Sequence, residues 1–99
     1  MPSSGYTTIR RATTSTVISS SARVIYSIIV HPAAGTRTEW TVHDDATGTA
    51  GGTAQNISVR SGSAASEKSV QEQFVGVRFG NGVYAELVAG TGTLFVEIS

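Results

Sequence analysis

The chain alternates large apolar residues with small or polar ones, in the two-residue period that is typical of β-strands. Stretches with this pattern are separated by segments rich in glycine, serine, threonine and proline, which favour turns and loops. We therefore predict strands over residues 23–30, 36–43, 54–60, 70–79, 83–88 and 93–98.

The predicted strand over residues 23–30 differs from the others because apolar residues occupy both of its faces. One face carries Val24, Tyr26, Ile28 and Val30, and the other carries Ile25, Ser27 and Ile29. Strands that are apolar on both faces are typical of the buried centre of a sheet. The strand over residues 36–43 instead has one apolar face, with Thr38, Trp40 and Val42 pointing inward.

The turns near the C-terminus predict a simple local topology. Asn81-Gly82 is the strongest hairpin signal in the chain, because a type I′ turn needs positive φ at both central residues. The segment 89–92 predicts a second tight turn, so the last three strands are expected to form a meander. In that arrangement Arg78 is expected to pair with Glu86 or Glu97. A short helix over residues 64–73 is the one alternative to an all-strand reading.

Residues 1–21 are polar and rich in serine and threonine, and we interpret them as an extended N-terminal arm. The arm is expected to supply short strands near residues 6–10 and 16–18, and a β-sandwich domain is expected over residues 22–99. Charge also divides along the chain. Before Glu39 the chain carries four arginines and no acid, and from Glu39 onward three basic residues oppose seven acidic ones.

Composition supports an all-β fold. Threonine, valine and isoleucine number 13, 11 and 7, whereas only two leucines occur in 99 residues. This length favours one domain with one small core. We predict a single antiparallel β-sandwich of seven or eight short strands, either jelly-roll-like or immunoglobulin-like.

Candidate catalytic and ligand-binding chemistry is weak throughout the sequence. The chain has no cysteine, no G-x-S-x-G nucleophile motif and no phosphate-binding glycine loop. His31 and His43 lie in or beside turns, and Asp44 and Asp45 are more simply explained as turn-capping residues than as metal ligands. We expect no enzyme activity, cofactor or metal site. We also expect no secretory signal and no membrane helix.

Several features together resemble the small β-sandwich virion proteins of tailed bacteriophages, of the head decoration or head fibre type. The resemblance spans about residues 22–98. Its motifs are a V-Y-x-I-x-V strand from Val24, an aromatic strand that ends in the acidic pair Asp44-Asp45, a G-x-x-F-x-x-G-x-Y stretch from Gly76, and a closing Gly90-Thr91-Gly92 turn. This family usually has Asp-Gly at the acidic turn, so the pair found here departs from its pattern.

The resemblance implies a non-enzymatic structural subunit, bound in many copies to a viral shell and located in the virion after assembly in the host cytoplasm. The implied partners are the major capsid protein or other virion proteins, and further copies of the chain, with no nucleic acid and no membrane. The residues expected at interfaces are Tyr6, Ile9, Arg10, Arg11, Val17, Ile18, Phe74 and Phe95.

Two other functions are compatible with the sequence. A carbohydrate-binding or adhesion module, including one carried by a phage tail, would need exposed aromatic residues. The exposure of Trp40, Tyr84 and Phe95 therefore separates this alternative from the shell subunit. A small enzyme would need a pocket in which polar groups converge.

Overall fold

The computed structural model describes residues 7–33, 36–49, 55–61 and 69–99, and within these ranges the chain forms eight strands and no helix. The strands are β1 (Thr8–Ala12), β2 (Thr16–Ser19), β3 (Arg23–Pro32), β4 (Thr38–His43), β5 (Asn56–Arg60), β6 (Val70–Phe79), β7 (Val83–Gly90) and β8 (Gly92–Ile98). The segment 70–73, which the helix alternative included, is part of β6. The rest of that alternative, residues 64–68, lies outside the described residues.

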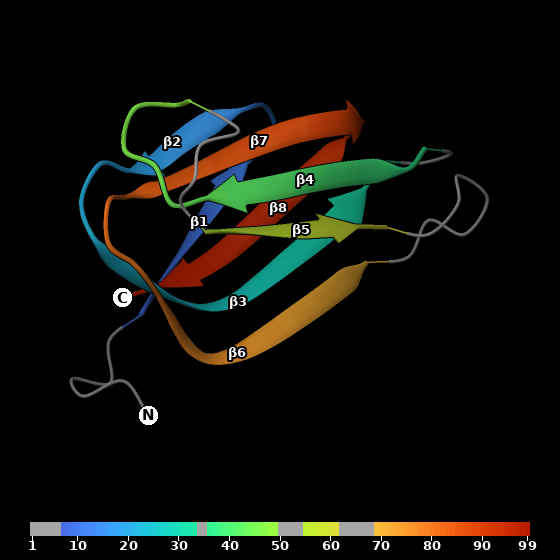
Figure 1. Ribbon diagram of the computed structural model, residues 1–99. Helices are drawn as coiled ribbons and strands as arrows, with labels where there is room; N and C mark the ends of the chain where they lie inside the picture. The colour runs from blue at the N-terminus through green and yellow to red at the C-terminus, as the bar shows by residue number, and fades with distance from the viewer. Residues whose placement is uncertain (1–6, 34–35, 50–54, 62–68) are drawn as a thin grey trace.

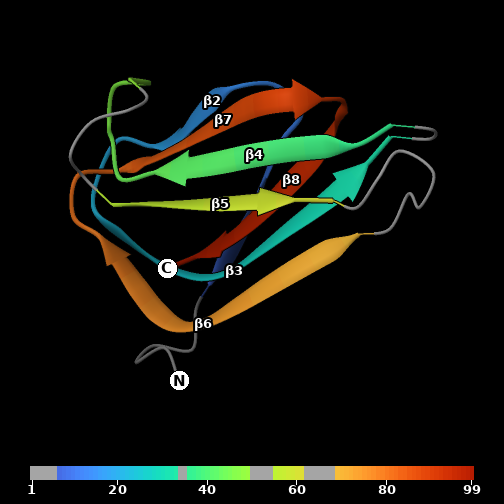
Figure 2. The ribbon, with the colours of Figure 1, turned by 45° about the vertical axis from the view of Figure 1, so that its right-hand side comes forward.

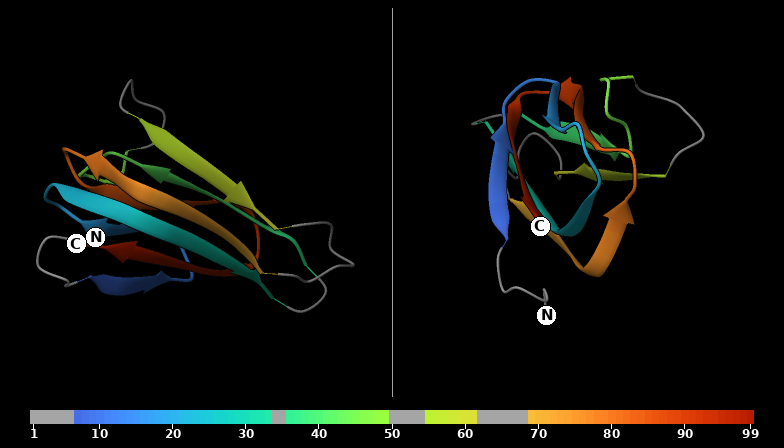
Figure 3. Two further views of the ribbon diagram at one scale, coloured as in Figure 1. Left: turned by 90° about the horizontal axis from the view of Figure 1, so that it is seen from below. Right: turned by 90° about the vertical axis from the view of Figure 1, so that its left-hand side faces the viewer.

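The strands form two antiparallel sheets that pack face to face as a sandwich (Figure 1). Sheet A has the strand order β1-β8-β3-β6, and sheet B has the order β2-β7-β4-β5. The right-hand panel of Figure 3 views the sandwich nearly along its strands. The prediction of an all-β antiparallel sandwich is therefore confirmed.

The pairing of the strands follows one simple rule. β1 pairs with β8, β2 with β7, β3 with β6, and β4 with β5, so the chain makes one long double-stranded ribbon. Rolling up this ribbon brings β8 beside β3 and β7 beside β4. This is the topology of an eight-stranded jelly roll rather than of an immunoglobulin sandwich, whose sheets have different strand orders.

The core lies between the sheets and is built from alternate positions of the strands. Thr38, Trp40 and Val42 of β4 face inward as predicted, and alternation likewise turns one face of β5, β7 and β8 into the core. Burial of valine, isoleucine and aromatic side chains is the main favourable contribution to folding. The buried apolar residues are Ala12, Ile18, Ile25, Ile28, Val30, Trp40, Val42, Val59, Phe79, Val83, Ala85, Leu94, Val96 and Ile98.

The expected C-terminal meander is wrong, because β6, β7 and β8 alternate between the two sheets. Three extended residues reach about 10 Å, which matches the usual spacing of packed sheets. A short turn can therefore connect strands of two packed sheets as well as two neighbouring strands of one sheet. Gly82 is needed here for close packing. A Cβ at this position would lie 2.7 Å from the carbonyl oxygen of Ser19 and 2.8 Å from the Cα of Ala46.

The crossing also removes the ion pairs that we expected for Arg78. Glu86 lies on sheet B and is paired with His43, whereas Glu97 lies on sheet A and accepts hydrogen bonds from Thr7 and Ser27. The tertiary structure determines which strands pair with one another, and the local sequence pattern does not encode this choice.

Bulges change which side chains of β3 and β6 face the core. Relative to β8, β3 contains one extra residue at Tyr26, so Ile25 faces inward together with Ile28 and Val30. The expectation that Val24 and Tyr26 share the inward face of Ile28 is therefore wrong. The bulge shifts the inward face of β3 by one residue. When the sequence is read as a strict alternation, apolar residues therefore fall on both faces of the strand.

The bulge continues into β6, where the residues between Val77 and Gln73 outnumber those facing them on β3. Gly76 has a φ of 129° in this segment. As a result Val75 is fully exposed, and Phe74 packs against the core instead of facing outward with Arg78. A strict alternation along β6 would instead place Phe74 on the same face as Arg78.

The N-terminal residues are part of the sandwich wherever the structure describes them. β1 forms an edge of sheet A and β2 forms an edge of sheet B. The short strands expected near residues 6–10 and 16–18 are therefore present, and β1 and β2 obtain their order from β8 and β7. The division of the chain at residue 21 is not a boundary between arm and domain, because β1 and β2 complete the two sheets.

Candidate functional site

The outer face of sheet A has an apolar row at its centre. Its central row runs across the sheet from Arg11 on β1 through Phe95 and Ile29 to Gln71 on β6. Phe95 and Ile29 are half-buried, and Arg11 is exposed beside them. The row therefore has an apolar centre with a basic residue at one end.

The neighbouring row of sheet A holds a carboxylate between hydroxyl groups. Glu97 accepts hydrogen bonds from the hydroxyls of Thr7 at 2.7 Å and Ser27 at 3.2 Å. Ile9, which faces Glu97 from the edge strand β1, is 66% exposed. Within the described residues no arginine or lysine forms an ion pair, so Arg11 does not neutralise Glu97.

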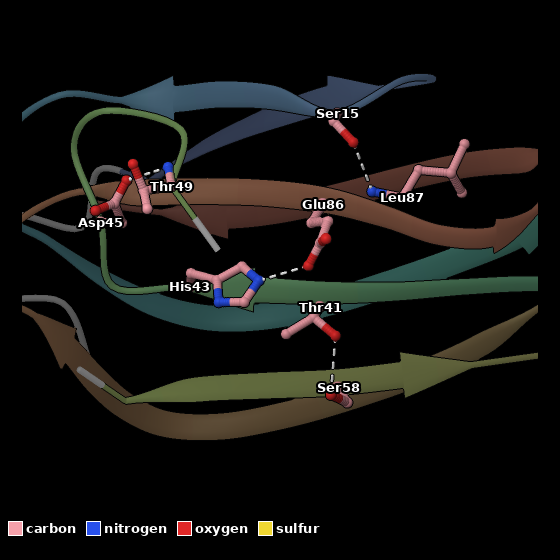
Figure 4. A network of polar contacts seen from close by, with 8 residues as sticks. All are labelled: Ser15, Thr41, His43, Asp45, Thr49, Ser58, Glu86 and Leu87. Carbon is pink, nitrogen blue, oxygen red and sulfur yellow. Dashed lines mark hydrogen bonds and ion pairs between the residues drawn. The ribbon is translucent and has the colours of Figure 1, made fainter. Parts of the chain in front are cut away.

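The outer face of sheet B is polar, and its groups are partnered with one another (Figure 4). His43 Nε2 lies 2.8 Å from Glu86 Oε1, and the His43 ring stacks on Tyr84 with centroids 5.6 Å apart. The hydroxyls of Thr41 and Ser58 are 3.0 Å apart. This face therefore offers few unsatisfied polar groups to a ligand.

Asp44 joins two parts of the fold that are distant in the sequence. Its side chain is buried and accepts backbone N–H bonds from Gly80, Asn81 and Gly82, at 3.1, 2.7 and 3.3 Å. These three amides form the crossing from β6 to β7. Asp44 therefore caps a turn as expected, but the turn is a remote one rather than its own.

We expect Asp44→Ala to destabilise the protein by about 2–3 kcal/mol, because three amides at the crossing lose a charged acceptor. Chemical denaturation followed by circular dichroism measures this change. Asp44→Asn is the matched control, since its amide oxygen retains part of the acceptor capacity and a smaller loss is expected. Equal stability of the wild type and both variants would contradict the proposed role of these bonds.

Asp45 organises the loop that leaves β4. Its Oδ2 accepts the backbone N–H of Thr49 at 2.9 Å and that of Thr47 at 2.8 Å. The N–H of Thr49, followed by that of Thr47, holds the pKa of the Asp45 carboxyl below its ordinary value of 3.8. Asp45 is half-buried and caps its own turn, as the sequence predicted.

The lowered pKa of Asp45 predicts how the loop responds to acid. A carboxyl whose pKa is lower in the folded state contributes stability that is present above its unfolded pKa. That contribution is lost as the pH falls through the folded-state pKa. We expect the Asp45 carboxyl to titrate below 3.8 in an NMR pH series, with the amide signals of Thr47 and Thr49 shifting at the same midpoint. In Asp45→Asn these amide shifts should be absent, and a midpoint above 3.8 in the wild type would contradict the prediction.

The residues expected at interfaces fall into three groups. Ile9, Arg10, Arg11 and Val17 are exposed on the edge strands β1 and β2, and Phe95 is half-buried on the outer face of sheet A. Ile18 is only 9% exposed because the alternation of β2 turns it inward, next to the outward-facing Val17, so its selection as an interface residue is wrong. Phe74 packs on the core, and Tyr6 lies outside the described residues.

The four N-terminal arginines do not form one basic surface. Arg10 and Arg11 are adjacent on β1, whereas Arg23 Nε donates a hydrogen bond to Ser19 Oγ at 3.0 Å, and Arg37 lies between β3 and β4. Only Arg10 and Arg11 form a local concentration of positive charge. Of the positive charge that the sequence places before Glu39, only the part on β1 is therefore concentrated in one place in the structure.

The aromatic residues do not form an exposed platform. Trp40 is 0% exposed, and its indole N–H donates to Thr38 Oγ1 at 2.7 Å inside the core. Tyr84 and Phe95 are half-buried on opposite outer faces. These positions do not provide the neighbouring aromatic rings on which a sugar chain would stack.

Polar groups gather at two surface hollows. One, of about 210 Å³, is lined by Glu39, Ser58, Val59 and Arg60 at the β5 edge. The other, of about 350 Å³, is lined by Thr13, His31, Pro32, Ala33, Thr91, Gly92 and Thr93. His31 Nδ1 lies 2.5 Å from Ser69 Oγ, but no carboxylate among the described residues bonds to the other ring nitrogen.

Metal-binding side chains are not clustered in the part of the chain that the structure describes, where no group of three histidine or acidic residues is placed to hold an ion. The same residues include no helix that is long and apolar enough to cross a membrane.

Sequence reasoning did not find two side chains that connect distant elements. The sequence suggests only a local turn-capping role for Asp44. The second side chain is Ser15, whose Oγ accepts the backbone N–H of Leu87 at 3.0 Å, where β2 begins beside β7 (Figure 4). An aspartate or serine next to a strand is common at local turns, so no sequence signal distinguishes these long-range roles.

No protein-family model matches the chain, and it shows no significant similarity to a curated protein or to a solved structure.

Proposed function

We propose that this protein is a non-enzymatic structural subunit of a tailed-bacteriophage virion, bound in many copies to the capsid shell as a decoration or head fibre protein. The proposal starts from the sequence resemblance to small β-sandwich virion proteins over about residues 22–98. The jelly-roll topology agrees with it, since viral capsid domains are among the proteins that use this fold. Fold alone does not imply function, so the surface must carry the argument.

The observation that carries the proposal is the outer face of sheet A. It combines the half-buried Phe95 and Ile29 with the exposed Ile9 and Arg11, in a sheet face that no described element covers. Accessible apolar residues rimmed by polar ones are typical of protein–protein contact surfaces. The outer face of sheet B differs at its centre, where polar side chains are paired with one another, and its exposed apolar residues Val17 and Val88 lie apart on β2 and β7.

The alternative function, a carbohydrate-binding or adhesion module, has less support. It depends on exposed aromatic residues, and the single tryptophan of the chain, Trp40, is wholly buried. A small enzyme also has less support, because neither hollow contains an activated nucleophile with a base and an orienting group.

The proposal is tested on virus particles purified from the organism that encodes the chain. Mass spectrometry is expected to find the protein in many copies per particle, and cryo-electron microscopy to locate it on the outer surface of the head. Absence from particles would overturn the proposal. Location at the tail, together with glycan binding, would overturn the shell assignment in favour of the adhesion alternative.

The orientation on the shell is tested by adding purified variants to particles that lack the protein. Phe95→Glu places a charge on the outer face of sheet A and is expected to reduce occupancy strongly. Val88→Glu is the matched control, because Val88 is 48% exposed on the opposite sheet. Equal occupancy of both variants would contradict the assignment of sheet A as the contact face.

A further inference from the structure

The sandwich has four edge strands, and they differ in how they are protected from pairing with other chains. β1 and β6 are the edges of sheet A, and β2 and β5 are the edges of sheet B (Figure 2). An edge strand presents unpaired backbone N–H and C=O groups that can bind another strand. Short length, bulges and charges are the usual means of preventing this.

Two of the four edges are interrupted. β6 carries the bulge at Gly76, with Val75 fully exposed beside it. β2 has four residues and a bulge between Val17 and Ser19. Neither strand offers a regular row of backbone groups along its whole length.

β1 is regular throughout. Its five residues pair with β8 in one uninterrupted register, from Thr8 opposite Ile98 to Ala12 opposite Leu94. No described strand pairs with its other edge. Ile9 is 66% exposed, and Arg10 and Arg11 are exposed with no ion-pair partner among the described residues.

We propose that β1 is a docking edge for an acidic β-strand of another protein, which extends sheet A by one strand. The backbone of β1 would supply the hydrogen bonds, and Arg10 and Arg11 would select carboxylates on the incoming strand. Ile9 would add apolar contact next to the face formed by Phe95 and Ile29. This inference rests on the proposed function in one respect only, namely that the incoming strand belongs to a shell protein.

The charge of β1 argues against a second copy of the chain as the occupant. The two-fold antiparallel pairing that uses all five residues places Arg10 opposite Arg10 of the other copy, with Ile9 opposite Arg11. Like charges directly opposite one another destabilise a strand pair. β6 of another copy carries Glu72, but its bulge limits the length of regular pairing.

β5 is also short and regular, and it provides an internal comparison. Its register with β4 is uninterrupted, but Arg60 faces Glu39 on the neighbouring strand. The charge at this edge is therefore balanced locally, unlike the two adjacent arginines of β1. An acidic strand should consequently prefer β1 to β5.

The probe for this inference is a capped peptide of valine residues with two adjacent glutamates, matched in length to β1, because Arg10 and Arg11 lie on opposite faces of the strand. Isotope-labelled full-length protein is titrated with it and followed by NMR. We expect shift changes and slower hydrogen exchange at the amides of β1, and none at β5 or β6. Raising the salt concentration from about 50 mM to about 500 mM should weaken binding, because the arginines are exposed.

Two control peptides separate backbone pairing from charge attraction. A lysine-for-glutamate peptide should not bind. A glutamate peptide N-methylated at every residue has no N–H donor on either edge and should also fail to bind. Binding of the N-methylated peptide with unchanged affinity would overturn the strand-pairing mechanism.

Charge-matched variants locate the site on the protein. The double variant Arg10→Glu with Arg11→Glu is expected to lower the peptide affinity by about tenfold or more. The control is Arg60→Glu with Arg78→Glu, which changes the net charge equally at exposed positions of β5 and β6. Both variants are first checked for a native amide spectrum. Equal weakening by both variants would overturn the assignment to β1.

The same binding experiments distinguish two other occupants of the β1 edge. Tighter binding of a single-stranded thymidine oligonucleotide at β1 would identify a nucleic-acid site and overturn the proposal. Self-association that Glu72→Arg abolishes would identify a second copy as the occupant, and would also overturn it. If the protein is found on virions but the acidic peptide does not bind, the docking edge fails while the proposed function stands.

Discussion

Replacing Trp40 with alanine is expected to destabilise the protein by about 3–5 kcal/mol, because the largest side chain of the core is removed. Trp40 is 0% exposed and faces Leu87 on β7 and Val59 on β5 within sheet B. A domain of this size has a total stability of about 5–15 kcal/mol, so the variant should lose a large share of it. Urea denaturation followed by circular dichroism measures the change.

Two controls accompany the Trp40 variant. Trp40→Phe keeps most of the buried volume but loses the hydrogen bond to Thr38 Oγ1, so its cost should be clearly smaller. Val88→Ala truncates a side chain that is 48% exposed and should change stability by about 0.5 kcal/mol or less. Wild-type stability of Trp40→Ala would mean that Trp40 is not a core residue, and would restore the carbohydrate-binding alternative.

The second large effect is expected at Gly90, where alanine should destabilise the fold by about 3 kcal/mol or more. Gly90 has a φ of 77°, a conformation that residues with a side chain rarely adopt. An added Cβ would also overlap the carbonyl oxygen of Arg37 and lie 2.7 Å from its carbonyl carbon. Both obstacles are in the backbone, so the turn between β7 and β8 would have to move. Thermal unfolding followed by circular dichroism measures the loss.

Gly80 provides the matched control for Gly90. A Cβ at Gly80 would meet nothing within 4 Å, and its φ is not in the positive range. Gly80→Ala should therefore be neutral, or slightly stabilising through the lower entropy of the unfolded chain. Similar melting temperatures for the Gly80 and Gly90 variants would contradict the conformation described for the turn from β7 to β8.

The same turn illustrates why glycines serve different purposes in this fold. Gly90 is required by its positive φ, whereas Gly92 is required by close packing, since its Cβ would lie 2.6 Å from the carbonyl oxygen of His31. In the sequence both residues predict only a tight turn. The structure assigns each a separate reason and therefore a separate response to substitution.

The candidate surfaces were only partly predictable from the sequence. Ile9, Arg10 and Arg11 were expected to be accessible, and they lie exposed on β1. The regular and unpaired edge that makes them a candidate docking site follows from the pairing of β1 with β8, at the opposite end of the chain. Ile18 shows the converse, because it was expected at an interface although the pairing of β2 with β7 turns its side chain into the core.

The sequence by itself determined the all-β class, the approximate positions of the strands and the inward faces of β4, β5, β7 and β8. These features follow from β-branched composition and two-residue alternation, which are local properties of the chain. Only the tertiary structure decided which strands pair, where β3 and β6 change faces, and that Asp44 holds the crossing from β6 to β7. The physical reason is that a strand satisfies its hydrogen bonds and its apolar face equally well with several partners. The choice among them depends on how the whole ribbon closes around one core.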